Sequence, residues 1–318
     1  MQQLITIFKK ELADHFSSYR FLILFALITM VSLVTVYMVS LSLSKDLEGI
    51  AKPGYVFLML FTSSGIQFSL VQFVAFFGPL IGLILGFDTI NRERNEGTLS
   101  KLLSQPIYRD TIVNAKFLAG VAVVAIMLAS IVLVITGLGL FMLGIVPGLE
   151  EIWRILIYLV ISIIYIAFWL GVSILFSILF RSVATSSLAA LAVWIFFSFF
   201  LSLGANAIAG TLTPDAGASN PESLLQRMQI ERAISLASPL ELYTGATATI
   251  MDPMRRSSES LVQVGMMEKL SMTRFSGPLP LSQSLLIVLP YIITLVAITA
   301  ICFAISYTVF MRQEVRSI

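Results

Sequence analysis

Long apolar stretches alternate with short polar ones along the whole chain. Six stretches contain no Asp, Glu, Lys or Arg: residues 21–44, 53–87, 117–149, 155–180, 182–214 and 275–311. Each is long enough for a helix across a hydrocarbon core of about 30 Å, which takes roughly 20 residues. Several are longer than that, so their ends include loop or interfacial residues. We predict six membrane-spanning helices at about residues 21–43, 64–88, 115–145, 155–180, 183–207 and 284–311.

The composition agrees with this pattern. Of the 318 residues, 58% are hydrophobic and 12% are charged, and the mean hydropathy is +0.94, whereas a soluble domain has about 25% charged residues. The first apolar stretch is too long for the hydrophobic part of a secretory signal, so we expect it to be retained as a helix. The chain is therefore predicted to be an all-α integral membrane protein with a single transmembrane domain over residues 1–318.

Residues 1–20 predict an amphipathic helix before the first span. Its apolar positions recur at three- and four-residue spacing, which places them on one helix face. They are Leu4, Ile5, Phe8, Leu12, Phe16 and Tyr19. Charged residues occupy the opposing face, so this helix is expected to lie in the membrane interface, although the same stripe fits packing on a partner protein equally well. His15 is the only histidine, and we interpret it as interfacial rather than as a ligand or base.

Lys and Arg are distributed unevenly between the two sides of the predicted bundle. One side carries Lys9, Lys10, Arg20, the five cations of residues 90–116, Arg181, Arg312 and Arg316. The short loops of the other side carry Lys45, Lys52 and Arg154. Because cation-rich loops stay in the cytoplasm, we predict a multi-pass protein of the cell membrane with both termini cytoplasmic.

This topology makes residues 208–280 an external loop, and the sequence predicts helices within it. Asn220-Pro221-Glu222 and Ser238-Pro239 are helix starts, each with a capping side chain and a proline at the first helical position. Six methionines also lie in the loop: Met228, Met251, Met254, Met266, Met267 and Met272. Thioethers suit Cu(I), but without Cys or His beside them we interpret these residues as apolar filler and expect no metal site.

Three glycines recur every four residues in the second predicted span: Gly78, Gly82 and Gly86. They share one face of the helix, where a second helix can approach closely. Pro79 can add a kink, which is tolerated where a neighbour satisfies the carbonyl that proline leaves unpaired. We favour packing within the chain, and a subunit contact or a substrate path are the alternatives.

The chain lacks the motifs of a membrane enzyme and of an ATPase. The six apolar stretches hold no ionisable acid or base, and Asp88 only borders the second, whereas ion-coupled transport usually places such residues inside the spans. The phosphate-binding motif G-x-x-x-x-G-K-[ST] is absent. The single cysteine, Cys302, excludes an internal disulfide, and a net charge of +2 does not suggest nucleic acid. If this protein moves anything uphill, the energy enters from another subunit.

The connector between the second and third spans, residues 89–112, is the richest polar segment of the predicted cytoplasmic face. Gly97 interrupts the helix that leaves the second span, Thr98 can cap a new short helix, and Pro106 ends it. The apolar side of this short helix consists of Leu99, Leu102 and Leu103. We therefore predict an amphipathic helix that lies crosswise between two spans and can transmit a push from a cytoplasmic motor.

Charged residues flank the short helix, with Glu93 and Glu96 before it and Arg109 after it. We expect the two acids to pair with cations on an ATPase surface. The alternatives are that both acids belong to a solvated face and that the leucines only contact lipid headgroups.

At these residues the chain resembles the permeases of the type-2 ATP-binding-cassette (ABC) exporter family, and especially its NosY-like group. The matching run is E-R-N-E-G-T-L-S-K-L-L-S-Q-P at residues 93–106, followed by Arg109 and by Lys116-Phe117-Leu118. K-K-E-L at residues 9–12 and S-P-L-E-L-Y at residues 238–243 extend the resemblance over nearly the whole chain. Two features depart from the family: Ser238 replaces an asparagine, and the external loop is long for the NosY-like group.

The resemblance implies a permease without a nucleotide site of its own. ATP and Mg²⁺ would bind to two partner ATP-binding subunits that dock on the connector, and a second copy or a related permease would complete the transporter. The residues expected to couple to the ATPase are Glu93, Glu96, Gly97, Thr98, Leu99, Leu102, Leu103, Pro106 and Arg109. An alternative is a mechanical transmission subunit that acts on an extracytoplasmic partner protein without translocating a substrate. A third hypothesis, an ATP-independent channel or carrier, is disfavoured by the charge-free spans.

Overall fold

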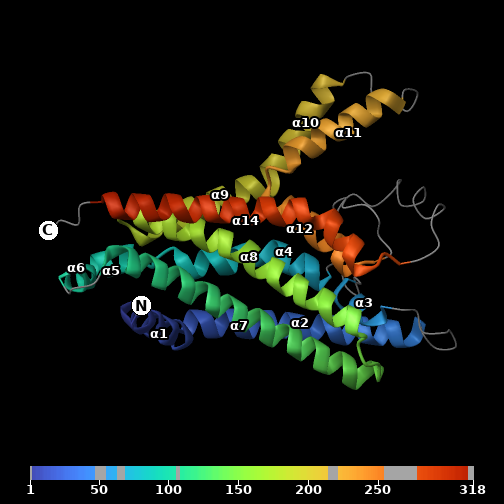
Figure 1. Cartoon of the computed structure of the whole chain (residues 1–318), viewed down its shortest axis with the longest axis horizontal. Coiled ribbons are helices and arrows are strands. Elements are labelled where there is room, and N and C mark those ends of the chain that lie inside the picture. The colour runs from blue at the N-terminus through green and yellow to red at the C-terminus, as the bar shows by residue number, and fades with distance from the viewer. Residues whose placement is uncertain are drawn as a thin grey trace.

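The computed structural model describes residues 2–46, 55–62, 69–104, 108–213, 221–253 and 278–313, and the elements in these ranges are helices (Figure 1). Six helices among the described residues are long and apolar enough to cross a membrane, which confirms the predicted number of spans. They contain α2 (Tyr19–Asp46), α4 (Leu70–Gly86), α7 (Arg109–Leu143), α8 (Leu149–Leu179), α9 (Val183–Ile195) and α14 (Leu281–Arg312). The chain is therefore an all-α, multi-pass membrane protein.

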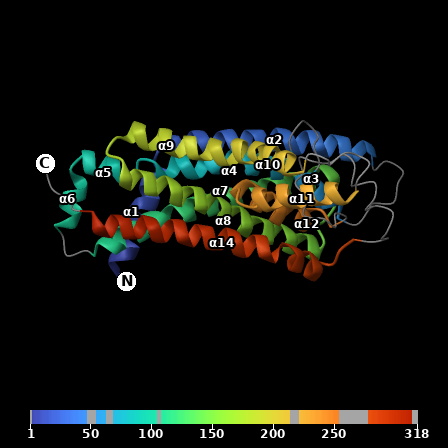
Figure 2. The same cartoon turned by 90° about the horizontal axis from the view of Figure 1, so that it is seen from above.

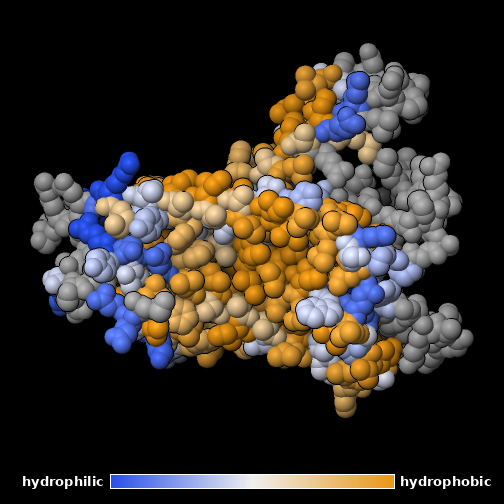
Figure 3. Space-filling view, viewed as in Figure 1, coloured by the Kyte–Doolittle hydropathy of each residue, from blue (hydrophilic) through white to orange (hydrophobic). Residues whose placement is uncertain are grey.

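The spans form an elongated bundle with helices lying side by side along its long axis (Figures 1 and 2). One end, which we name the connector end, holds α1 (Gln2–Phe16), α5 (Asn91–Asn95), α6 (Thr98–Leu103) and the Arg312 end of α14. The opposite end holds the short helix α3 (Val56–Thr62). On the face in Figure 3, apolar side chains form a broad band between hydrophilic ends, as a membrane-embedded surface requires.

Two spans begin earlier in the sequence than their charge-free stretches. Helix α7 begins at Arg109 rather than near residue 115, and α8 begins at Leu149 rather than at residue 155. Charged residues are acceptable in these turns because protein groups satisfy them. The side chain of Glu151, for example, accepts hydrogen bonds from the backbone N–H groups of Gly148 (2.7 Å) and Phe57 (3.0 Å). The start expected for the second span, residue 64, lies outside the described residues, and α4 begins at Leu70 behind a capping box at Ser69.

The glycine face of α4 packs against α8, so the three glycines make a contact within the chain. A Cβ atom added at Gly82 would lie 2.7 Å from the carbonyl oxygen of Ile166, and one at Gly86 would lie 2.8 Å from the Cβ atom of Ser173. At Gly78 the nearest atom, in Ile166, would be 3.1 Å away. The two backbones therefore approach at a distance that side chains on α4 would prevent.

The segment expected as an external loop divides into two parts. Helix α9 continues through a π-helical turn, η1 (Phe196–Phe200), into α10 (Leu201–Leu212), and α10 pairs with α11 (Pro221–Ser235) in a hairpin that projects from the bundle (Figure 1). In contrast, α12 (Pro239–Met251) is buried from Leu242 to Met251 and packs against α8 and α14. The small residues of α12 permit this close packing. Hydropathy did not predict a helix inside the bundle here, because α12 is too short to span a membrane and contains Glu241.

Candidate functional site

The connector folds locally as its sequence predicts, with a break between two short helices. Gly97 separates α5 from α6 and has a φ of +71°, in the left-handed region where a side chain is strained. Thr98 is the first residue of α6, and its hydroxyl donates a hydrogen bond to the carbonyl oxygen of Glu93 (3.2 Å) across the break. The break turns the chain so that α6 lies at the end of the bundle rather than continuing α4.

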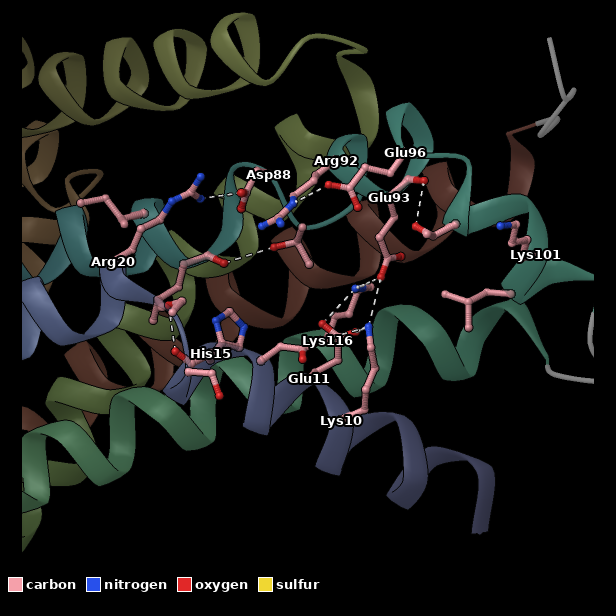
Figure 4. Close-up of a pocket in the computed structure, with 18 residues that line it drawn as sticks. Lys10, Glu11, His15, Arg20, Asp88, Arg92, Glu93, Glu96, Lys101 and Lys116 are labelled. Carbon is pink, nitrogen blue, oxygen red and sulfur yellow. Dashed lines mark hydrogen bonds and ion pairs between the residues drawn. The ribbon is translucent and has the colours of Figure 1, made fainter.

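A buried lysine joins the connector to two other helices. The side chain of Lys116, in α7, is 3% exposed, and its Nζ lies 2.8 Å from Oε1 of Glu93 and 3.0 Å from Oε2 of Glu11 (Figure 4). Lys10 contributes a second ammonium, 3.1 Å from Oε1 of Glu11 and 3.8 Å from Oε1 of Glu93. Two carboxylates and two ammonium groups thus link α1, α5 and α7, and we name Lys10, Glu11, Glu93 and Lys116 the ionic cluster.

Burial and pairing set the charge states in this cluster. Burial by itself raises the pKa of Glu11, but the neighbouring Lys116 and Lys10 ammonium groups outweigh it and hold that pKa below its usual value. Burial alone would lower the pKa of Lys10. Its carboxylate partners, Glu11 above all, outweigh this effect, so the pKa of Lys10 lies above its usual value. The pKa of Glu11 and the pKa of Lys10 are thus both shifted in the direction that favours the ionised form.

A cavity of about 710 Å³ adjoins the ionic cluster, between α1 and the segment from the end of α4 to α6 (Figure 4). The charged side chains that line it include as many acids as Lys and Arg residues. The acids are Glu11, Asp14, Asp88, Glu93 and Glu96, and the bases are Lys10, Arg20, Arg92, Lys101 and Lys116. Most of these groups pair with one another: Arg20 with Asp88, Arg92 with Glu96, and the members of the ionic cluster. The cavity is thus lined by groups that already compensate each other's charge.

The apolar side of α6 faces protein. Leu99 is buried in the main core, and Leu102 packs with Ile7 of α1 and with Ile112 and Ala115 of α7. For these two leucines, the structure contradicts the alternative that they contact only lipid headgroups. The side chain of Leu103 and the whole of Pro106 lie outside the described residues.

The two acids expected to face an ATPase differ in their surroundings. Glu93 is largely buried in the ionic cluster, with 12% of its side chain exposed. Glu96 is about half exposed and pairs with Arg92 (2.9 Å) one helical turn away. Glu93 thus braces the connector from inside, and of the two acids only Glu96 lies on its exposed surface.

A glutamine ties the connector to the last span. The side-chain carbonyl of Gln313 accepts a hydrogen bond from Arg94 (2.6 Å), and its backbone carbonyl accepts one from Arg109 (3.0 Å). Its amide nitrogen donates to the carbonyl oxygen of Ile178, at the end of α8 (2.9 Å). Arg109 thus belongs to a contact between the connector, α8 and α14.

No role for Lys116, Glu11 or Gln313 could be predicted from the hydropathy or the spacing of the sequence. A signal for Lys116 was available, because a lysine next to an apolar stretch is costly to bury unless acids pair with it. Nothing in the sequence identified which acids those are. Among the described residues no three His, Cys, Asp or Glu side chains are grouped to hold a metal ion.

A search of curated proteins found no match to the chain. The family model described as "ABC-2 family transporter protein" matches residues 5–315. This match includes most of α1, the connector, the ionic cluster and all six spans, and it confirms the resemblance to ABC permeases at the level of the family. The chain belongs to the ABC-2 family of transporter proteins.

Proposed function

We propose that this chain is the permease subunit of an ABC exporter, of the NosY-like group, driven by a separate ATP-binding subunit that docks on the connector. In this proposal the connector end faces the cytoplasm of the cell, since that end carries most of the Lys and Arg residues near span ends. A second copy of the chain or a related permease completes the transporter. ATP and Mg²⁺ bind to the partner, because the chain has no phosphate-binding motif.

The observation that carries the proposal is the position of Lys116 between Glu93 and Glu11. A connector that only joined two spans would need no buried charge, because taking ions out of water is costly unless each is paired. Here the paired charges fasten α5 to α1 and to α7. A displacement of the connector by an ATPase would therefore move these helices together instead of bending a loose loop.

The surface left for docking is the polar side of the connector. Arg92, Glu96, Lys101 and Tyr108 are exposed there, while Leu99 and Leu102 hold α6 against the bundle. Exposed charges of both signs give a partner the means for electrostatic recognition, and exposed aromatic rings are enriched where proteins bind each other.

Charge reversal on this surface tests the proposal. The tagged permease is co-expressed with each ABC-type ATPase of its source genome, and co-purification and nucleotide hydrolysis are measured. We expect one ATPase to bind and Lys101→Glu to weaken that binding. Lys45→Glu is the matched control, because Lys45 is an exposed lysine at the opposite end of the bundle. Equal binding by both variants, or binding of no ATPase, contradicts docking on the connector.

The hairpin of α10 and α11 supports a second candidate, a transmission subunit that acts on an extracytoplasmic protein. The hairpin projects from the bundle as a helical arm (Figure 1), and large apolar side chains of α10 such as Leu203 and Leu212 are exposed. In this hypothesis the arm binds the extracytoplasmic protein and transmits the movement of the bundle to it. Under this hypothesis, shortening the arm abolishes the cellular function while ATP-dependent export from proteoliposomes is never detected. Under the exporter hypothesis, export is reconstituted by the permease and the ATPase alone.

A further inference from the structure

Helix α12 is a half-length helix within the bundle. Near its N-terminal end, the hydroxyl of Ser238 donates to the carbonyl oxygen of Phe197 in η1 (2.9 Å), and the hydroxyl of Tyr243 lies 2.9 Å from that of Ser162, near the middle of α8. Its other end lies beside Arg154, near the start of α8. The helix therefore fills the interior of the half of the bundle that is remote from the connector.

The residues that α12 presents to its neighbours are mostly small. The run Gly245-Ala246-Thr247-Ala248-Thr249 is buried, and a Cβ atom at Gly245 would come within 2.9 Å of the Tyr291 ring in α14. Small side chains permit close approach but interdigitate little, so they offer few obstacles to sliding or withdrawal. Core packing by Tyr243, Ile250 and Met251 holds the two ends of α12, and polar contacts at these ends add to it.

Arg154 provides the polar contact at the outer end. Its side chain is fully buried, and it donates to the carbonyl oxygens of Ile250 (2.9 Å) and Leu279 (2.6 Å) and to the hydroxyl of Ser284 (3.3 Å). A longer contact reaches the carbonyl oxygen of Thr249 (3.5 Å). One guanidinium thus connects α8 with the last turn of α12, with the residues before α14 and with α14 itself.

The charge of Arg154 suits this position for two reasons. A cation at the C-terminal end of a helix interacts favourably with the unpaired carbonyl groups there. Its carboxylate partner, Glu150, lies 2.9 Å away and has 37% of its side chain exposed, so the ion pair opens toward the outer surface. Beside it, the backbone N–H of Leu279 donates to the carbonyl oxygen of Pro253 (2.9 Å), which joins the two chain segments that follow α12 and precede α14.

We propose that α12 is the outer gate of the permease and that Arg154 is the latch that holds it closed. This inference rests on the proposed function, because a gate has a purpose only in a transporter. Opening toward the extracytoplasmic side would release the last turn of α12 from Arg154 and draw the small-residue face away from Tyr291.

Cysteine labelling tests the latch. In a Cys302→Ser background, which removes the only native cysteine, Thr249→Cys places a thiol at a fully buried position of α12. Labelling by an impermeant maleimide from the outside should be slow. Adding Arg154→Met should raise its rate by about tenfold or more, the change produced by a loss of roughly 1.4 kcal/mol in the closed state.

A second reporter separates gate opening from general loosening. Ile135→Cys places a thiol at a fully buried position of α7, toward the end of the bundle that is remote from the connector, and there Arg154→Met should leave the rate unchanged. Unchanged labelling at position 249, or a parallel rise at both positions, overturns the latch. In the native-Arg154 complex with its ATPase, nucleotide should change labelling at position 249, and an identical rate with and without ATP overturns the gate. Failure of any ATPase to co-purify contradicts the proposed function instead, and leaves the labelling result on the permease alone intact.

Discussion

The hydroxyl of Tyr165 in α8 donates a hydrogen bond to the carbonyl oxygen of Ala75 in α4, 2.9 Å away. This is the carbonyl that Pro79, four residues later, leaves without its helical partner, since proline has no N–H group. In hydrocarbon no water is available to satisfy such a group. The tyrosine therefore makes the proline tolerable, and it fastens α4 to α8 at the same point.

Replacing Tyr165 by phenylalanine should destabilise the protein by about 1–3 kcal/mol, the cost of leaving one buried carbonyl group unpaired. The phenyl ring retains the stacking on Tyr243, whose ring centroid lies 4.4 Å away, so the change isolates the hydrogen bond. Unfolding of the purified protein in detergent measures the loss.

Pro79→Ala provides the matched background for this change. An alanine N–H can bond to Ala75 directly and make the tyrosine hydroxyl redundant. Tyr165→Phe should therefore cost less in the Pro79→Ala protein than in the native one. An equal cost in the two backgrounds would show that the hydroxyl does not compensate for the proline.

Gly82→Ala should also be destabilising, although alanine is normally the better helix former. Its Cβ would lie 2.7 Å from a backbone oxygen and 2.9 Å from a backbone nitrogen of α8, and backbone atoms cannot move aside as a side-chain end can. We expect a loss of about 1–3 kcal/mol, as for overpacking in a core, and a larger loss for Gly82→Leu.

Gly137 in α7 is the control for this prediction. A Cβ atom there would meet nothing within 4 Å, so Gly137→Ala should be neutral or stabilising by up to about 1 kcal/mol. Thermal unfolding of both variants in the same detergent compares them. If Gly82→Ala and Gly137→Ala have the same effect, the glycine face is not where α4 and α8 meet most closely.

Features that depend on neighbouring residues in the sequence could be predicted. The spans follow from local hydropathy, the break at Gly97 from backbone freedom, and the close contact at Gly82 from helical periodicity. The partners of Lys116 could not be predicted, because α1 and α5 supply them from separate segments. Arg154 was predicted to lie in a loop, because a hydropathy pattern places every charged side chain in contact with water. In the structure, carbonyl groups from distant segments accept its hydrogen bonds inside the protein.

The position of His15 predicts a dependence of stability on pH. Burial lowers the pKa of its imidazole below the usual 6.5; Lys116 lowers it further, while Glu11, Asp88 and Asp14 oppose the shift. The unfolded chain therefore binds a proton more readily than the folded one as the pH falls below about 6.5, so stability declines in that range. Above it, His15 is neutral in both states and contributes no pH dependence.

Unfolding between about pH 7.5 and pH 5 measures this effect. The range stays above the ordinary pKa of Glu11, 4.5, whose folded pKa is lowered and whose own contribution is lost only at more acidic pH. The His15→Gln variant should show a flatter profile than the native protein. An identical slope in the two proteins would exclude His15 as the titrating group.

Glu93 and Glu96, which the sequence suggested as a pair of docking acids, should respond differently to neutralisation. Glu96→Gln breaks only an exposed ion pair with Arg92 and should cost less than about 0.5 kcal/mol. Glu93→Gln weakens the ionic cluster and should cost about 1–3 kcal/mol, because Glu11 still pairs with Lys116. Lys116→Met should cost most, about 3–5 kcal/mol, because it leaves two carboxylates in a largely buried site with only the half-exposed Lys10 ammonium to compensate their charge.

Measuring unfolding and ATPase coupling on the same preparations separates bracing from docking. Glu96→Gln should weaken ATPase binding with little loss of stability, because Glu96 lies on the exposed side of the connector. Glu93→Gln should leave binding nearly intact but reduce the hydrolysis that the permease stimulates, since a loosened α5 passes less of the motion to α1 and α7. Equal losses of stability in the two variants, or unchanged stimulation in Glu93→Gln, would contradict a brace. The force would then have to enter the bundle through the contact between Arg94, Arg109 and Gln313 instead.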